Sequence, residues 1–358
     1  MAAAVQKKRV VVVGGGIAGA NTVKALENYA DVTLIDPKDY FEIPWAKLRS
    51  MVEPSFGERS VFLHSEYLKT AKLITSAVTK ATDESVVTAS GERVKYDYLV
   101  LATGTAYDGP ASKSARIKHF QSDNKKIKDA KTVLIIGGGP TGVELAGEIA
   151  VDFPEKKVIL LHSGPRLLEF VGEKASRKAL AWMKSHKVEV HLNERIDLES
   201  LTETTTSFTT NGGKSIHADC HFVCIGKKLG SSWMKDSPFG GSVDERGQVK
   251  VDSNLRVEGT TNVFAAGDII NVKELKQGMC AQKHAQVVAE NIKKLSKDPK
   301  QTKLSSYKAS PDMALITLGR NTAVGQFPFG AFSGRLPGMI KSKDLFVGPT
   351  RKGLGLKS

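Results

Sequence analysis

The sequence feature that most constrains the fold is an apolar run that ends in a glycine-rich turn, and it occurs twice. Residues 10–19 read VVVVGGGIAG and residues 133–142 read VLIIGGGPTG. In both, a β-branched run leads into G-x-G-x-x-G and then into a helical pattern, the order that a dinucleotide pyrophosphate requires. The first glycine makes the tight turn, the second lets phosphate approach the backbone, and the third lets the helix pack on the strand. Two such units predict two dinucleotides bound side by side, where electrons can pass between them.

The composition narrows the class of protein. The chain has 358 residues, enough for two full domains and a shorter piece, and no apolar run approaches the roughly 20 residues that cross a bilayer. Residues 1–9 hold no apolar signal region, and Ala2 stands where N-myristoylation needs glycine. Three cysteines are too few for a disulfide framework. We therefore expect a cytoplasmic protein, with a net charge of +14 that suits an anionic cofactor, an anionic membrane or nucleic acid.

The order of the remaining patterns predicts the domain organisation. After the first turn, a helix over about residues 18–29 leads to a strand that ends at Asp36, where a carboxylate can accept ribose hydroxyls. Residues 255–268 read as a return to the first domain after the second unit. We predict an α/β fold with two Rossmann-like dinucleotide-binding domains, the second inserted into a discontinuous first, plus a short C-terminal segment. The predicted ranges are 1–107 and 251–300 for the first domain, 108–250 for the second, and 301–358 for the C-terminal segment.

The combination of both glycine turns with the Ala-Thr-Gly turn at 102–104 and the Gly-Asp pair at 267–268 resembles the two-dinucleotide-binding flavoprotein reductases. In that family FAD occupies the first site and a nicotinamide dinucleotide the second, and Asp268 is implied to contact the ribityl-phosphate region of FAD. No Cys-x4-Cys or Cys-x2-Cys lies near either turn, so we expect no redox disulfide beside the flavin.

Residues 36–39, 318–326 and 341–347 narrow the resemblance to the ferroptosis-suppressor branch of the apoptosis-inducing-factor-like proteins, related in plan to type II NADH dehydrogenases. This resemblance implies an NAD(P)H:quinone oxidoreductase that passes hydride to FAD and two electrons to a ubiquinone-like lipid, protecting membranes from peroxidation. Animal members are N-myristoylated, which Ala2 forbids. Contact with a membrane or lipid droplet then rests on the basic, aromatic-containing tail at 331–358, which suits an interfacial segment. Alternatively, that tail packs its aromatic side chains on the core.

The resemblance also implies roles for individual side chains. Glu144 reaches toward the nicotinamide and the flavin edge, Lys308 is the cation near flavin N1 and O2, and His284 can deliver a proton to the quinol. Glu144 could instead complement its helix dipole, Lys308 could be solvated, and His284 could be packed. Motifs and resemblance together imply FAD contacts from Gly14, Gly15, Gly16, Ile17, Ala18, Gly19, Asp36, Lys38, Arg49, Val78, Ala102, Thr103, Gly104, Asp268, Met279 and Gln282. They imply nicotinamide dinucleotide contacts from Gly137, Gly139, Pro140, Thr141, Gly142, Glu144, His162, Arg166 and Gly226.

The end of the strand that follows the second glycine-rich turn and its helix bears on whether NADPH or NADH binds. NAD-selective sites carry Asp or Glu there, which repels a 2′-phosphate. In this chain residues 158–161 end in His162, and Arg166 follows. We expect NADPH to be accepted, with NADH also usable; alternatively, His162 only caps the strand and selectivity is loose.

Other functions remain open at this stage. His217, Cys220, His221 and Cys224 include zinc-ligand types, but strand alternation sends Cys220 and His221 to opposite faces, so we predict no metal site. A second enzyme reading is a reductase of monodehydroascorbate or of a ferredoxin-type protein. A third hypothesis is a redox-linked protein whose positive charge binds nucleic acid without regard to sequence.

Overall fold

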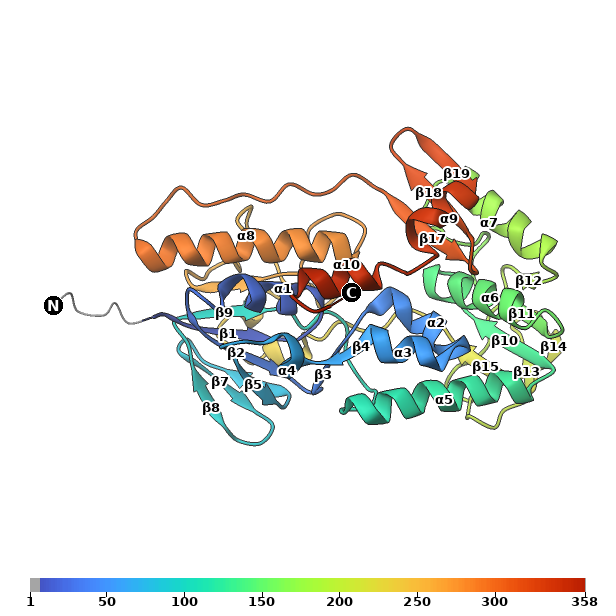
Figure 1. Cartoon of the computed structure of the whole chain (residues 1–358), viewed down its shortest axis with the longest axis horizontal. Coiled ribbons are helices and arrows are strands. Elements are labelled where there is room, and N and C mark those ends of the chain that lie inside the picture. Colours follow the sequence, from blue (N-terminus) through green and yellow to red (C-terminus); the bar gives the residue numbers. More distant parts are fainter. Residues whose placement is uncertain (1–6, 358) are drawn as a thin grey trace.

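The computed structural model of the chain describes residues 7–357. The expectations for residues 1–6, including the one that rests on Ala2, lie outside the described residues. Within that range the chain forms two parallel sheets flanked by helices, with an antiparallel sheet near its C-terminus (Figure 1). The prediction of an α/β fold with two Rossmann-like domains is confirmed.

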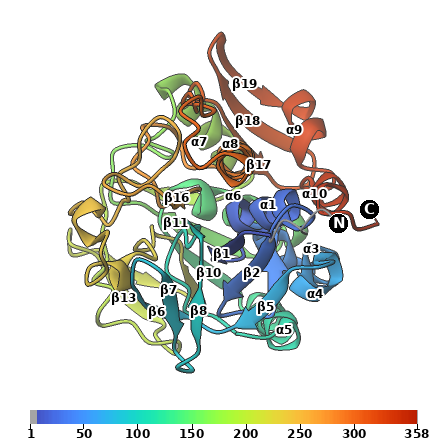
Figure 2. The ribbon, with the colours of Figure 1, turned by 90° about the vertical axis from the view of Figure 1, so that its left-hand side faces the viewer.

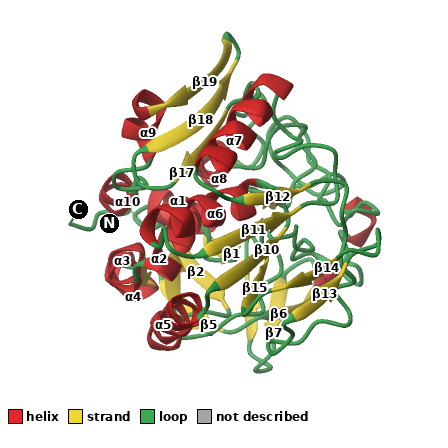
Figure 3. Ribbon diagram, turned by 90° about the vertical axis from the view of Figure 1, so that its right-hand side faces the viewer, coloured by secondary structure: helices red, strands yellow, loops and turns green. Residues whose placement is uncertain are grey.

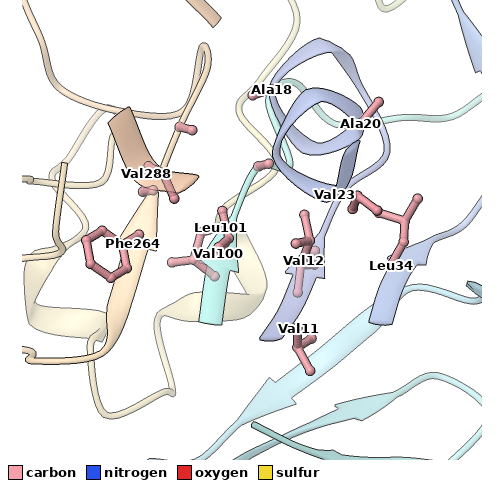
Figure 4. Close-up of a cluster of buried hydrophobic side chains, with 14 of the residues drawn as sticks. Val11, Val12, Ala18, Ala20, Val23, Leu34, Val100, Leu101, Phe264 and Val288 are labelled. Carbon is pink, nitrogen blue, oxygen red and sulfur yellow. The ribbon is translucent and has the colours of Figure 1, made fainter. Parts of the chain in front are cut away.

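The first parallel sheet has the strand order β16-β9-β1-β2-β5. Its central strand β1 is buried because four consecutive valines follow Arg9, and α1 and α8 pack on the same side of the sheet (Figure 4). Strand β16 comes from far along the chain and pairs with β9, so the first domain is discontinuous as predicted. The bounds are β1 Arg9–Val13, α1 Ile17–Leu26, β2 Asp31–Asp36, β5 Lys72–Thr75, β9 Tyr98–Leu101, β16 Val263–Ala265 and α8 Gly278–Lys297.

Smaller elements complete the first domain. An antiparallel sheet of β6 to β8 lies beside the parallel sheet (Figure 2), and β3 pairs with β4. Short helices follow β3 and β4. The bounds are β3 Tyr40–Glu42, η1 Pro44–Ala46, α2 Lys47–Val52, α3 Pro54–Ser60, β4 Val61–Leu63, α4 His64–Tyr67, β6 Val78–Ala81, β7 Ser85–Thr88 and β8 Arg93–Lys95.

The second parallel sheet has the order β12-β11-β10-β15 (Figure 3). Cys220 faces the core shared with α5, α6 and α7, whereas His221 packs on Phe208 at the other face, so the predicted alternation is confirmed. Among residues 7–357, no three His, Cys, Asp or Glu side chains gather in a way that could hold a metal ion. The bounds are α5 Lys113–Asp129, β10 Thr132–Ile136, α6 Pro140–Asp152, β11 Lys157–Leu161, α7 Glu173–Ser185, β12 Glu189–His191, β13 Ser207–Thr209, β14 Ser215–His217 and β15 Cys220–Val223.

The return to the first domain begins earlier than the sequence suggested. Met234, Phe239 and Val249 are buried in the core of the first domain, although the predicted second domain ran to residue 250. This stretch consists of short 3₁₀ turns, η2 Ser232–Met234 and η3 Gly240–Ser242, and isolated bridges. Because it carries no regular hydrophobic period, its partner domain could not be read from the sequence.

The C-terminal segment folds into an antiparallel sheet of β17, β18 and β19 followed by two helices. Ile316, Leu318 and Val324 join the core of the second domain, whereas Leu345 and Val347 join that of the first. The segment therefore ties the two nucleotide domains together. Its bounds are β17 Ala314–Leu318, β18 Thr322–Phe327, β19 Gly330–Gly334, α9 Arg335–Lys341 and α10 Val347–Gly353.

A buried ion pair joins the two domains beneath this segment. Arg49 on α2 donates to both carboxylate oxygens of Glu148 on α6, at 2.6 and 2.8 Å, and each side chain is only 2% exposed. Arg49 also donates to the backbone oxygen of Ser342, which precedes α10. Burial raises the pKa of Glu148, while Arg49 pulls it down. Removing one member of such a pair leaves an uncompensated buried charge.

We expect Arg49→Ala to lower the free energy of unfolding by about 3–5 kcal/mol. Arg59→Ala is the matched control, because Arg59 pairs with Asp344 at 2.9 Å in a half-exposed position, and such pairs contribute less than about 1 kcal/mol. Urea denaturation at saturating FAD measures both. Equal and small losses in the two variants would contradict the structural role of the Arg49–Glu148 pair.

Candidate functional site

The two glycine-rich turns are one structure built twice. Gly14 and Gly137 have φ of +100° and +120°, a left-handed conformation that favours glycine. A Cβ on either would lie under 3.0 Å from a backbone carbonyl, that of Ala102 at the first turn and that of Cys224 at the second. Gly19 and Gly142 face the carbonyls of Gly14 and Gly137 in the same way. No side chain fits at these four positions.

The middle glycines behave differently. At Gly16 and Gly139 a Cβ would meet no atom within 4 Å. These two residues are the N-caps of α1 and α6, and in residues 7–357 neither helix has a side-chain cap or an acidic residue in its first turn. The free N–H groups of the first turns therefore remain available to an anion, although in α6 they begin at Thr141 because Pro140 has no N–H. The residues fit a pyrophosphate at each turn, that of FAD at α1 and that of a nicotinamide dinucleotide at α6.

The two second strands end in different side chains at equivalent positions. The register of β1 with β2 and of β10 with β11 places Asp36 and His162 opposite the same point of each turn. A carboxylate oxygen of Asp36 accepts the N–H of Gly15, and Nδ1 of His162 accepts the N–H of Gly138 at 3.1 Å. Since Nδ1 is an acceptor, the proton of a neutral His162 lies on Nε2. A neutral imidazole thus replaces the carboxylate in the second site.

The surroundings of Asp36 include a residue that the sequence analysis missed. The other oxygen of Asp36 accepts both the backbone N–H and the Nζ of Lys38, at 2.8 Å each. His64, at the start of α4, is fully buried with Nε2 4.0 Å from Asp36. Burial lowers the pKa of His64 to about 4, so the ring is neutral. Nothing in the sequence marks His64, because α4 is a single short turn without a motif.

The loop after β11 changes the expected role of Arg166. Its guanidinium donates to the backbone oxygens of Glu169 at 2.6 Å and Val171 at 2.8 Å, with a longer contact to Leu168. These contacts leave few donors for a 2′-phosphate. The carboxylate of Glu169 also turns back against Gly164, which the sequence analysis did not foresee. His162 is therefore the better-supported part of the selectivity argument.

Glu144 is clasped by the C-terminal segment. Its Oε1 accepts from the N–H and the hydroxyl of Thr317, at 3.0 Å each, and from Nζ of Lys341 at 2.7 Å. Lys341 also donates to the carbonyl of Leu315 at 2.9 Å. Thr317 and Lys341 were missed as site residues, although residues 341–347 carried part of the resemblance. The second carboxylate oxygen of Glu144 takes no part in these bonds.

The cations of the site differ from the expectation. Lys308 is exposed on the connector between α8 and β17, and it forms no ion pair with any of residues 7–357. Lys341 is held on Glu144, and Lys47 lies half-buried at the start of α2, where burial and nearby Arg116 lower its pKa. Lys341 and Lys47 are thus partly buried lysines, while the role of Lys308 stays a prediction.

The Gly-Asp turn and the helix α8 after it carry four residues that the sequence analysis expected at the FAD and quinone site. Asp268 is half-buried and its pKa is raised by burial, and it accepts no hydrogen bond from residues 7–357. Met279 and Gln282 lie in the first turns of α8, where Met279 is exposed. His284 is buried between Gly267 and Glu274, so the expected direct proton delivery to a quinol conflicts with its position.

The other predicted contacts lie mainly at the carboxyl ends of the two sheets, where ligands of open α/β sheets bind. Thr103 and Gly104 follow β9, and Gly226 follows β15, as the sequence order implies. Arg49 is bound to Glu148 and Val78 is buried in β6, so their contacts with FAD remain predictions.

This geometry defines a class of protein, a flavoprotein oxidoreductase with two dinucleotide sites. The chain matches the model of the pyridine nucleotide-disulphide oxidoreductase family over residues 8–287, and it belongs to that family. It is an FAD-dependent NAD(P)H oxidoreductase.

Individual relatives agree over almost the full length. The chain is 32% identical to apoptosis-inducing factor homolog B of Dictyostelium discoideum, over 96% of this chain and 95% of that protein. It is 32% identical to ferroptosis suppressor protein 1 of Taeniopygia guttata, over 97% and 96%. The fold also matches the sulfide:quinone oxidoreductase of Aquifex aeolicus with a TM-score of 0.74 at 18% identity, covering 97% and 92% of the two chains. No helix within residues 7–357 has the length and apolar character to cross a membrane.

We expect Gly139→Ala to leave the fold intact and to weaken NADPH binding roughly tenfold or more, because its methyl group occupies space left for phosphate. Gly142→Ala should instead destabilise the protein by about 1–3 kcal/mol, because its Cβ collides with the carbonyl of Gly137. Thermal unfolding and NADPH titration separate the two effects. Normal NADPH affinity in a folded Gly139→Ala protein would contradict the phosphate site at α6.

Proposed function

We propose that the protein transfers electrons from NADPH or NADH through FAD to a lipid quinone. The family assignment supports the first half of this path, since it supplies FAD and a nicotinamide dinucleotide. A relative named ferroptosis suppressor protein 1 and a structural neighbour named sulfide:quinone oxidoreductase support a quinone as the acceptor.

The observation that carries the proposal is the two-sided contact of the C-terminal segment. Inward, Thr317 and Lys341 hold Glu144 at the second glycine turn. Outward, Phe329 is 78%, Leu336 78% and Met339 72% exposed. An apolar acceptor therefore meets an apolar surface on the same segment that completes the nicotinamide site.

The cysteines of the chain support this choice over a dithiol relay. Cys220, Cys224 and Cys280 are free. Burial raises the pKa of Cys220 to about 11 and that of Cys224 to about 12, and it also raises that of Cys280. Because the thiolate is the reactive form, these thiols are poor electron carriers between flavin and substrate.

The protein itself holds the two cofactors, orients the side chains around them and shields them from solvent. When bound, the flavin supplies the redox chemistry, taking hydride from the nicotinamide and giving two electrons to the acceptor. The N–H groups at Gly16 and Gly139 hold the two pyrophosphates. Lys341 and Thr317 orient Glu144, so its second carboxylate oxygen is directed by contacts with the segment rather than by solvent.

We also propose that NADPH is used at least as well as NADH. The neutral imidazole of His162 replaces the carboxylate that would repel a 2′-phosphate. Glu169 near Gly164 opposes this preference, so a large discrimination against NADH is not expected.

Contact with a membrane is the further part of the proposal. β18 and β19 project from the body next to α9 (Figures 1 and 2). Phe327, Phe329 and Phe332 cluster on this hairpin with ring centroids 5.5–6.2 Å apart. Exposed Arg335 and Lys343 lie in and just after α9. Exposed aromatic and aliphatic side chains beside basic ones suit the interface of an anionic bilayer. We define the docking surface as Phe329, Phe332, Leu336, Met339 and Ile340.

We expect NADPH oxidation by the FAD-loaded protein to be slow alone and fast when a short-chain ubiquinone analogue is added. Glu144→Gln should lower kcat/KM for the quinone reaction roughly tenfold or more, because the amide removes the negative charge that pairs with Lys341 and replaces the second carboxylate oxygen by an N–H donor. Absorbance at 340 nm measures both, and replacing NADPH by NADH measures selectivity.

The matched control is Glu155→Gln, an exposed carboxylate of the same domain, which should leave the rate unchanged. Flavin reduction without any effect of quinone would refute the quinone as acceptor. Monodehydroascorbate or a ferredoxin would then be the acceptors to test.

We expect the protein to sediment with vesicles that contain phosphatidylserine, and less so at high salt or with phosphatidylcholine alone. Leu336→Ser with Met339→Ser should weaken this binding severalfold, because both side chains lie on the docking surface. Tyr29→Ser is the control, as an exposed ring on another element. Binding unaffected by the paired change would place the membrane contact elsewhere, and equal binding to duplex DNA would favour a general polyanion site.

A further inference from the structure

A buried polar cluster beneath the Gly-Asp turn is not explained by the proposed function. Glu274 lies between β16 and α8 with its side chain 0% exposed. Its Oε2 accepts from the hydroxyl of Tyr307 at 2.6 Å and from the N–H of Ser310 at 2.9 Å. Its Oε1 lies 2.9 Å from Nε2 of His284, which is itself 1% exposed.

The imidazole of His284 connects Glu274 to the backbone of Gly267, and we call this chain of contacts the relay. Nδ1 of His284 accepts the N–H of Gly267 at 3.2 Å. Since Nδ1 is an acceptor and burial lowers the pKa of His284 to about 4, the ring is neutral and carries its proton on Nε2. The 2.9 Å contact does not meet hydrogen-bond geometry, and neither Nε2 of His284 nor Oε1 of Glu274 has a hydrogen-bond partner in residues 7–357, so the carboxylate faces the ring nitrogen directly. The carboxylate therefore selects the tautomer that can accept from Gly267.

The position of Gly267 gives this relay a consequence for FAD. Gly267 has φ +83°, and its α-carbon faces Ala18 in the first turn of α1, with a Cβ there lying 3.2 Å from that of Ala18. Asp268 follows directly and has no donor from residues 7–357. The turn thus sits between the phosphate-facing end of α1 and the start of α8, and any shift of Gly267 moves Asp268 relative to both.

Other charged groups do not replace Glu274 in this role. Lys276, two residues after Glu274, donates to the carbonyls of Ile270 and Val272. Glu274 also fastens the connector that leads to β17, because Tyr307 and Ser310 belong to it. One carboxylate is therefore bound on one side to the connector and on the other to the imidazole that supports the FAD turn.

We propose that Glu274 is a positioning residue of the FAD site, which acts through the tautomer of His284 on the Gly267 turn and hence on Asp268. The proposal concerns retention of FAD and does not depend on which acceptor the enzyme reduces. An isosteric amide reveals the role without changing shape. The amide oxygen of Glu274→Gln must face Ser310, because the N–H of Ser310 can only donate. The amide NH₂ then faces Nε2 of His284, which forces the ring proton to Nδ1 and ends acceptance from Gly267.

The test is the rate of FAD release from the holoenzyme, followed by the rise of flavin fluorescence on dilution. Glu274→Gln should release FAD roughly tenfold faster or more, and the imidazole ¹⁵N shifts of His284 should report a change from the Nε2–H to the Nδ1–H tautomer. Glu290→Gln is the matched control. Glu290 lies on α8 and accepts from Ser305 of the same connector at 2.8 Å, but it does not touch His284. It should change FAD release less than twofold.

Unchanged FAD release in folded Glu274→Gln protein overturns the proposal, and so does equally fast release in Glu290→Gln, which would point to general loosening of the connector. Should Glu274→Gln not fold, His284→Asn provides the second test. An asparagine oxygen can accept from Gly267 without help from a carboxylate, so FAD should be retained. Fast release of FAD from folded His284→Asn protein contradicts the relay.

Discussion

The close approach of each glycine-rich turn to a neighbouring strand end is the constraint on which the rest of this structure depends. The carbonyls of Ala102 and Cys224 occupy the space that a Cβ would need at Gly14 and Gly137. Because strand, turn and helix meet there without side chains, α1 and α6 begin at open space beside the carboxyl ends of their sheets. An anion at such a helix start meets free N–H groups and the positive end of the dipole. The same backbone geometry is therefore open to a pyrophosphate at both turns.

Neutral imidazoles support these backbone sites. His162 accepts the N–H of Gly138 beside the second turn, and His284 accepts the N–H of Gly267 beside the Gly-Asp turn. A histidine can serve in this way only while one ring nitrogen is unprotonated, and burial secures that state for His284 by lowering its pKa. In the first site the carboxylate of Asp36 takes the corresponding place and is balanced by Lys38. The strand end of the first site thus carries a charged side chain, Asp36, whereas that of the second site carries an imidazole, His162.

The C-terminal segment packs against both nucleotide domains and joins them. It contributes side chains to both cores, and its Ser342 carbonyl contacts Arg49 of the buried ion pair. Lys341 brings a cation from the end of the chain to Glu144 on α6. A buried charge that is paired and hydrogen-bonded needs its partner in place, so the surroundings of Glu144 are complete only when this segment is folded. The same short helix, α9, carries exposed apolar side chains at Leu336, Met339 and Ile340 as well as Lys341, which bonds to Glu144.

The repeated glycine motif and the alternating side chains of the strands determined the two Rossmann-like domains. They also determined the four glycines at which no side chain fits and the positions of Asp36 and His162. All of these depend on local spacing along the chain. The early return of Met234 and Val249 to the first core was not predictable, since irregular turns carry no periodic signal. Nor were Lys341 and Thr317 on Glu144, the pairing of Arg49 with Glu148, or Glu274 on His284. The contacts of Glu144 and of Arg49 join residues far apart in sequence, and the contact of Glu274 with His284 joins a loop to the helix that follows it. Only the packing of the two domains and the C-terminal segment decides which distant partners meet, because a polar side chain takes whichever complementary group burial brings within reach.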